Sequence, residues 1–104
     1  HFLLCVNAAN TTKDFEWIAS HSEGDVEVRD VSESYVLLAL QGPLAAQILQ
    51  RVTSVSLADL KPFHFVYGDL NQTRCLISRT GYTGEDGFEL YCEPGAGETI
   101  WNLL

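Results

Sequence analysis

The sequence predicts an α+β fold built on an antiparallel sheet, and two observations carry that prediction. Short apolar runs typical of strands alternate with stretches whose apolar residues recur at helical spacing. The chain has 104 residues, 46% of them hydrophobic, which is enough for a real hydrophobic core. We therefore expect residues 1–104 to form a single compact unit.

The first elements are expected to be a strand, a helix and a second strand. Residues 1–7 form an apolar, strand-like run. Thr11, followed three positions later by Asp14, predicts a capped helix start. Val26, Val28 and Val31 lie among polar residues, which predicts a half-buried strand over 26–32.

The middle of the chain predicts a strand followed by a helix. Residues 34–41 are a nearly continuous apolar run, which favours a strand covered on both faces. Gln41-Gly42-Pro43 is interpreted as the strand-to-helix turn rather than as a ligand contact, with Pro43 in the first helical turn. Apolar residues then follow a helical stripe through 44–52.

The remaining elements are expected to be three strands and a last helix. The strands are predicted over 63–70, running into a Gly68-Asp69 turn, over 73–80 and over 87–93, and the helix over 95–104. This order is typical of a ferredoxin-like split β-α-β unit on an antiparallel sheet. Because the chain opens on an apolar run, stops in a helix and has no Met, we expect it to be a piece of a longer polypeptide.

Composition excludes several classes of function. Against 14 Asp and Glu stand only 6 Lys and Arg, so a nucleic-acid partner is not expected. No apolar run approaches the length of a membrane span, so no membrane partner is expected. Cys5, Cys75 and Cys92 are widely spaced and lie in strand-like runs, which predicts buried, reduced thiols rather than disulfides, and no metal site is expected.

The stretch RTGYTGEDGFELY, residues 79–91, is the most distinctive in the chain. Gly81, Gly84 and Gly87 permit a tight connection between two strands, and they also let a ligand approach the main chain. A phosphate loop is excluded, because strand leads to strand here and two acids would repel an anion. Arg79 has two readings, an ion pair or a contact with a ligand carboxylate.

Glu89 is the candidate binding residue of this stretch. Strand alternation places Phe88, Leu90 and Cys92 on one face and Glu89 with Tyr91 on the other. Glu89 then either faces water or faces a cavity, where its carboxylate would accept two parallel hydrogen bonds from a planar edge such as an aminopyrimidinone. Tyr82 is a candidate aromatic wall for such a ligand.

Four ordered blocks resemble the aminomethyltransferase family, the T-protein of the glycine cleavage system. They are FLLCVNAANTTKDFEWI, VLLALQGPLAAQILQ, LKPFHF and RTGYTGEDGFELY, and together they extend across essentially the whole chain. The resemblance implies a larger folate-binding multidomain fold, with residues 1–104 a central part of its folate-binding domain. It also implies transfer of an aminomethyl carbon from the dihydrolipoyl arm of the H-protein to tetrahydrofolate, with release of ammonia.

The resemblance implies roles for six residues. Glu89 would bind the amino-pyrimidinone edge of the pterin and Tyr82 would line the folate site. Asn7 and Asn10, with Val6 beside them, would border the pterin, and their amides can both donate and accept. The last of the six, Phe63, stands where some relatives place a tyrosine near the folate.

The resemblance also implies what this chain lacks. The catalytic aspartate of the family is expected N-terminal to residue 1, and a folate-anchoring arginine C-terminal to residue 104. Asp14 and Asp86 have a helix-start and a turn explanation and are not candidates for that role. We therefore expect no useful turnover from residues 1–104 alone.

Two other readings remain open at this point. One is a folate-binding relative, in a dimethylglycine- or sarcosine-oxidising enzyme or an iron–sulfur assembly factor; the GYTGEDGFEL run favours the aminomethyltransferase over both. The other is a non-catalytic folded unit that pairs with other domains. The expected compartment is the bacterial cytoplasm or the mitochondrial matrix.

Overall fold

The computed structural model describes all residues, 1–104, and divides them into two compact units, 1–32 and 33–104. The expectation that the whole chain is one unit of a larger folate-binding domain stays a prediction. The helices, 3-10 turns (η) and strands are η1 Ala8–Asn10, α1 Thr11–His21, η2 Ser32–Ser34, β1 Val36–Gln41, α2 Ala45–Gln50, β2 Phe65–Leu70, β3 Thr73–Ser78, β4 Gly87–Cys92, η3 Pro94–Ala96 and α3 Gly97–Leu103. None of the helices combines the length and the apolar character that a membrane-spanning helix needs.

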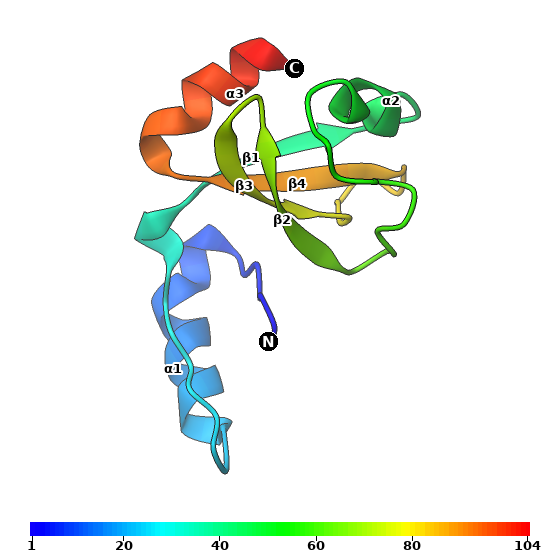
Figure 1. Ribbon diagram of the computed structural model, residues 1–104. Coiled ribbons are helices and arrows are strands. Elements are labelled where there is room, and N and C mark those ends of the chain that lie inside the picture. The colour runs from blue at the N-terminus through cyan, green and yellow to red at the C-terminus, as the bar shows by residue number, and fades with distance from the viewer. The chain divides into compact units, whose positions relative to one another are not determined.

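The predicted α+β class and antiparallel sheet are confirmed. The four strands follow the order β1-β4-β3-β2, and every neighbouring pair is antiparallel. Two strands, β4 and β3, therefore lie between β1 and β2, the strands that flank α2 in sequence (Figure 1). The arrangement is consistent with a ferredoxin-like fragment of a larger domain.

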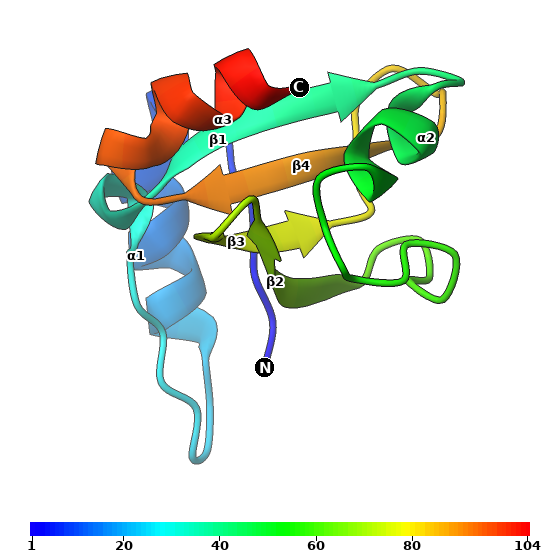
Figure 2. The same ribbon diagram turned by 45° about the horizontal axis from the view of Figure 1, so that its top comes forward.

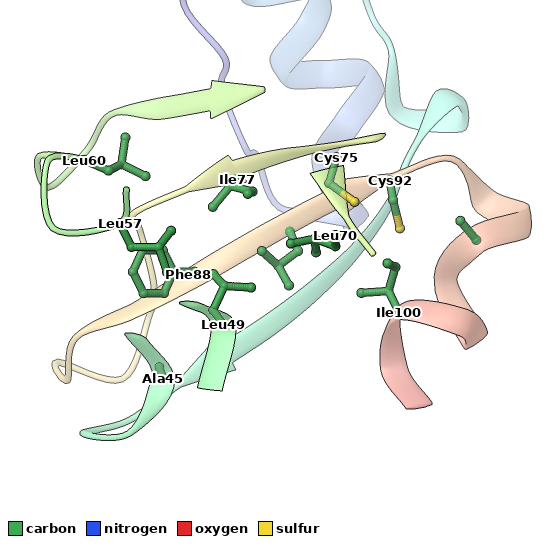
Figure 3. Close-up of a cluster of buried hydrophobic side chains, with 12 residues drawn as sticks. Ala45, Leu49, Leu57, Leu60, Leu70, Cys75, Ile77, Phe88, Cys92 and Ile100 are labelled. Carbon is green, nitrogen blue, oxygen red and sulfur yellow. The ribbon is translucent and has the colours of Figure 1, made fainter. Parts of the chain in front are cut away.

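The hydrophobic core lies on one face of this sheet, beneath α2 and α3 (Figure 2). Inward-facing residues of β3 and β4 meet Ala45 and Leu49 of α2 and Ile100 of α3. Figure 3 shows these side chains converging between the strands and the two helices. The buried core residues are Ala45, Leu49, Leu57, Leu60, Leu70, Cys75, Ile77, Phe88, Leu90, Cys92, Ala96 and Ile100.

The predicted alternation of β4 is confirmed by this core. Phe88, Leu90 and Cys92 are buried in it, whereas Glu89 is half-buried and lies on the other face. In β1 only one face is covered, and Leu37 on the other face is 40% exposed. The expectation that both faces of this strand are covered is therefore wrong, because both helices of the unit pack on the same side.

Two predicted strands do not form, since neither residues 1–7 nor 26–32 are in a strand. The expected order of strand, helix, strand, strand, helix in the first half is wrong for this reason. A strand exists only where its backbone N–H and C=O groups pair with another strand. The apolar pattern at Phe2 and Leu4 is present without such pairing, and Phe2 is 96% exposed.

The unit of residues 1–32 is organised around α1. Asp14 lies in its first turn as predicted, but the N-cap is Asn10 rather than Thr11. The η1 turn runs directly into the helix, and the Thr11 hydroxyl donates to the Ala8 carbonyl instead, at 3.0 Å. No residue of α1 is buried, because a unit of this size has too little chain to enclose a core of its own.

The turn between β2 and β3 lies later than predicted. Gly68 and Asp69 belong to β2, and the two-residue hairpin turn is Asn71-Gln72. These two residues have φ of 44° and 74°, the positive angles that a type I′ hairpin turn requires. Glycine occupies position 68 of this strand because the Val55 side chain packs closely against it. A Cβ at this position would lie 2.3 Å from Cγ2 of Val55.

The cysteine prediction holds for two of the three thiols. Cys75 and Cys92 are buried directly opposite each other on β3 and β4, and all three cysteines are free. Burial raises the pKa of the Cys75 thiol to about 12, which keeps it protonated and unreactive. Cys5 is exposed, because the run that contains it does not form the predicted strand.

Candidate functional site

The glycine-rich connection between β3 and β4 is closed by an ion pair. Nε and Nη2 of Arg79 donate to the two carboxylate oxygens of Asp86, at 3.0 and 2.7 Å, and Nη1 donates to the Leu60 carbonyl at 2.9 Å. This paired hydrogen bonding lowers the pKa of Asp86 and raises that of Arg79. Of the two readings of Arg79, the structure shows the ion pair.

Gln41, at the end of β1, ties the two ends of this connection together. Its Nε2 donates to the Thr80 carbonyl at 3.2 Å and to the Phe88 carbonyl at 3.1 Å. The next residue, Gly42, donates its N–H to the Asp86 carbonyl at 2.9 Å. The sequence interpretation gave this dipeptide only a turn role; the structure adds a second role, because it anchors a loop about 40 residues away along the chain.

Two of the loop glycines are needed because the Gln41 side chain packs directly against them. A Cβ at Gly81 would lie 1.9 Å from Oε1 of Gln41, and a Cβ at Gly87 would lie 2.3 Å from the same atom. Both distances are far below van der Waals contact, so only glycine lets the amide lie between the loop ends. The third glycine has another cause, because Gly84 adopts a φ of +78°.

A hollow of about 210 Å³ lies at this loop. Its lining includes Pro62, Phe63, Thr80 and the Arg79–Asp86 ion pair, but neither Glu89 nor Tyr82. A larger hollow of about 580 Å³ has Tyr35, Arg74 and Glu93 among its lining residues. None of the predicted site residues lines it. No group of three or more His, Cys, Asp or Glu side chains in residues 1–104 is arranged to hold a metal ion.

Glu89 lies in the middle of β4, between two small residues. It is paired with Ala39 on β1 and with Ser78 on β3. Directly opposite residues on one face have Cβ atoms about 5 Å apart, so small neighbours leave space above the carboxylate. The predicted placement of Glu89 on the face away from the core is confirmed, and the side chain is half-buried there.

The protein holds this carboxylate by one oxygen. The Thr80 hydroxyl donates a short hydrogen bond to Oε2 of Glu89, and the Tyr91 hydroxyl lies 3.5 Å from the same atom. Oε1 is not among the buried polar atoms that lack a partner, and no residue donates to it. Oε1 therefore keeps its capacity to accept a hydrogen bond from a ligand.

The aromatic neighbour of Glu89 is Tyr91, which sequence reasoning did not select. Its side chain lies on the same face of β4, and its ring meets that of Tyr35 edge to face, with centroids 6.3 Å apart. The alternation of β4 was a signal that could have identified it, because it puts residues 89 and 91 on one face. Thr80 and Gln41 had no comparable signal, since their contacts depend on the loop path and on strand register.

Tyr82 and Phe63 are both presented to solvent. Tyr82 is fully exposed in the loop, and Phe63, which lines the hollow of about 210 Å³, is 88% exposed. The structure thus does not bring Tyr82 against the Glu89 carboxylate. A role for these two rings in ligand binding stays a prediction.

Phe63 is held in an uncommon backbone conformation. It occupies the third position of the turn Lys61–His64, which is closed by a 3.1 Å bond from the His64 N–H to the Lys61 carbonyl. Its φ is +60°, an angle that costs a residue with a Cβ about 1–2 kcal/mol. Strain of this kind at an exposed aromatic residue is typical of positions kept for contact rather than for stability.

We expect Phe63→Gly to raise the free energy of unfolding by about 0.5–1 kcal/mol, because glycine adopts this φ without steric cost but loses more chain entropy. Urea unfolding followed by fluorescence measures the change. Phe63→Ala is the matched control, since it removes the ring and keeps the unfavourable angle. Equal stability of the two variants would contradict this account.

Val6, Asn7 and Asn10 belong to the unit of residues 1–32. Asn7 and Asn10 are exposed, and they flank η1, where the Asn10 N–H donates to the Asn7 carbonyl at 2.8 Å. Val6 is half-buried. Because Glu89 is in the other unit, the proposed gathering of these residues around one ligand stays a prediction.

Comparisons with known proteins agree with the resemblance of the four blocks. The family profile described as the GCVT N-terminal domain matches residues 1–104. Aminomethyltransferases of Geobacillus kaustophilus and Desulforamulus reducens are each 54% identical to 99% of this chain, and that of Bacillus licheniformis is 51% identical. The chain spans only about 29% of the length of the first of these relatives.

These matches cover the glycine loop, the Gln41 anchor and the strand that carries Glu89, along with both compact units. They confirm the aminomethyltransferase resemblance that was inferred from the motifs. From its first residue to its last, this chain belongs to the GCVT N-terminal domain family of aminomethyltransferases.

Proposed function

We propose that the protein containing this chain transfers an aminomethyl carbon to tetrahydrofolate in glycine cleavage. The donor is the aminomethyl-dihydrolipoyl arm of the H-protein, and the products are methylenetetrahydrofolate, ammonia and the dihydrolipoyl arm. Membership in the family supports the transferase class. The folate and the lipoyl-carrying partner are part of the proposal, as is a bacterial cytoplasmic or mitochondrial matrix location.

The observation that carries the proposal is the Glu89 carboxylate. The Thr80 and Tyr91 hydroxyls both contact Oε2 and not Oε1, and the cross-strand neighbours of Glu89 are small. A carboxylate in this setting fits a ring edge that offers two parallel N–H donors, as an aminopyrimidinone does. When bound, the folate supplies the nitrogen atoms that accept the carbon, and Glu89 orients the ring.

The remaining predicted contacts would complete the site. Tyr82 and Phe63 would offer exposed aromatic surface to the folate, and Asn7, Asn10 and Val6 would border the pterin. Two acids of this chain are not proposed as proton carriers. Asp86 is occupied by Arg79, and Asp14 lies in the first turn of α1. We propose that the catalytic acid lies outside residues 1–104.

We expect Glu89→Gln to weaken tetrahydrofolate binding by about 5–150-fold, which corresponds to roughly 1–3 kcal/mol. The amide would place a donor against ring donors and would remove the negative charge. Calorimetric titration of tetrahydrofolate under anaerobic conditions, into the protein with all its natural flanking sequence, measures the change.

Glu93→Gln is the matched control for this experiment. It makes the same change of charge at an exposed residue just beyond the end of β4. We expect its affinity for tetrahydrofolate to equal that of the unmodified protein. If Glu89→Gln and Glu93→Gln bind equally well, the folate proposal is wrong.

A further inference from the structure

We propose that Thr80 is a positioning residue that fixes the Glu89 carboxylate for ligand binding, an inference that rests on the proposed function. Thr80 lies just beyond the end of β3, and Glu89 lies in the middle of β4. The Thr80 hydroxyl donates to Oε2 of Glu89. The Tyr91 hydroxyl lies farther from this carboxylate, at 3.5 Å from the same oxygen.

A second hydroxyl orients the first. Oγ of Ser78 lies 3.0 Å from Oγ1 of Thr80. A hydroxyl has one proton, so when Thr80 donates to the carboxylate, its oxygen is free to accept from Ser78. Ser78 is 7% exposed and Thr80 is half-buried, so water has limited access to compete for these groups. The result is a directed chain from Ser78 through Thr80 to Glu89.

The main chain under this hydroxyl chain is also fixed. Nε2 of Gln41 donates hydrogen bonds to two carbonyls. One belongs to Thr80 itself, and the other belongs to Phe88, the residue before Glu89. The Gln41 amide therefore joins the main chain at Thr80, just beyond β3, to the main chain of β4 next to Glu89. The Thr80–Glu89 contact does not depend on loop flexibility.

Holding Oε2 has a consequence for the ligand. A carboxylate that can rotate freely must be ordered when it accepts two parallel hydrogen bonds, and that ordering reduces affinity. The Thr80 bond fixes the carboxylate plane in advance. It leaves Oε1 for one ring donor, and a second ring donor would replace the weak contact that the Tyr91 hydroxyl makes with Oε2 at 3.5 Å. Thr80 thus acts through Glu89 and does not touch the ligand.

The test compares Thr80→Val and Thr80→Ser in the protein with its natural flanking sequence, titrated with tetrahydrofolate. Val has the shape of Thr without the hydroxyl, and we expect it to weaken binding about tenfold. Ser keeps the hydroxyl without the methyl group, and we expect an affinity within about twofold of the unmodified protein. Urea unfolding of each variant establishes that it is folded.

A double variant separates positioning from a general structural role. In the Glu89→Gln background, Thr80→Val is expected to produce no further loss, because the carboxylate through which it acts is gone. A Thr80→Val loss that persists in this background, or one that Thr80→Ser shares, overturns the positioning role. The positioning role is also overturned if Thr80→Val leaves the affinity for tetrahydrofolate unchanged while Glu89→Gln weakens it. That result would leave the proposed folate site intact. If Glu89→Gln leaves affinity unchanged, the proposed function fails and this inference fails with it.

Discussion

Phe88→Ala is expected to lower the free energy of unfolding of the unit of residues 33–104 by about 3–5 kcal/mol. Phe88 is 1% exposed and packs in the core with Leu49 and Leu57, as Figure 3 shows. Alanine would leave a cavity that strands and helices on both sides cannot fill by local adjustment. Since a domain of this kind is stable by only about 5–15 kcal/mol, the variant should unfold at much lower urea concentration.

Tyr82→Ala is the contrasting change, because Tyr82 is fully exposed. Its free energy of unfolding should stay within about 0.5 kcal/mol of the unmodified protein. Urea titration of both variants, followed by circular dichroism, measures the two values. A similar loss in both would mean that Phe88 is not the core residue described above.

Gly87→Ala is expected to cost about 2–4 kcal/mol of stability, although alanine suits the backbone at this position. The added Cβ would lie 2.3 Å from Oε1 and 2.5 Å from Cδ of Gln41. The Gln41 amide would have to leave, and the Thr80 and Phe88 carbonyls would lose their shared donor. Removing one partner of buried hydrogen bonds costs more than the bonds themselves contribute.

Two further variants test this explanation. Gly95→Ala is the matched control, since nothing lies within 4 Å of its added Cβ, and its stability should change by less than about 0.5 kcal/mol. Gln41→Ala combined with Gly87→Ala should cost little more than either change alone, because each removes the same contact. Fully additive losses would show that the two positions act independently.

Much of the sheet could be predicted from the sequence. Apolar runs bounded by turn residues identified all four strands of the unit of residues 33–104, and the alternation in β4 placed Glu89 away from the core. The same pattern was wrong at residues 1–7 and 26–32. An apolar run shows that a segment fits a sheet, but it carries no information on whether a partner strand is present to pair with it.

The candidate site was predicted less completely, for a physical reason. Glu89 follows from local alternation, but the groups that hold it are set by long-range geometry. Thr80 reaches it across the turn of a loop, and Gln41 reaches that loop from a strand about 40 residues away. Spacing in the sequence does not reveal such contacts, because they depend on strand register and on which glycines leave room.

The alternation of β4 links the position of the binding carboxylate to the core. If β4 slipped by one residue against β1 and β3, Glu89 would enter the apolar layer and Phe88 would turn to solvent. An unpaired buried charge and an exposed aromatic ring together would be severely unfavourable. Single-residue insertions or deletions within β4 are therefore incompatible with this fold, because the hydrophobic core on one face keeps the carboxylate on the other.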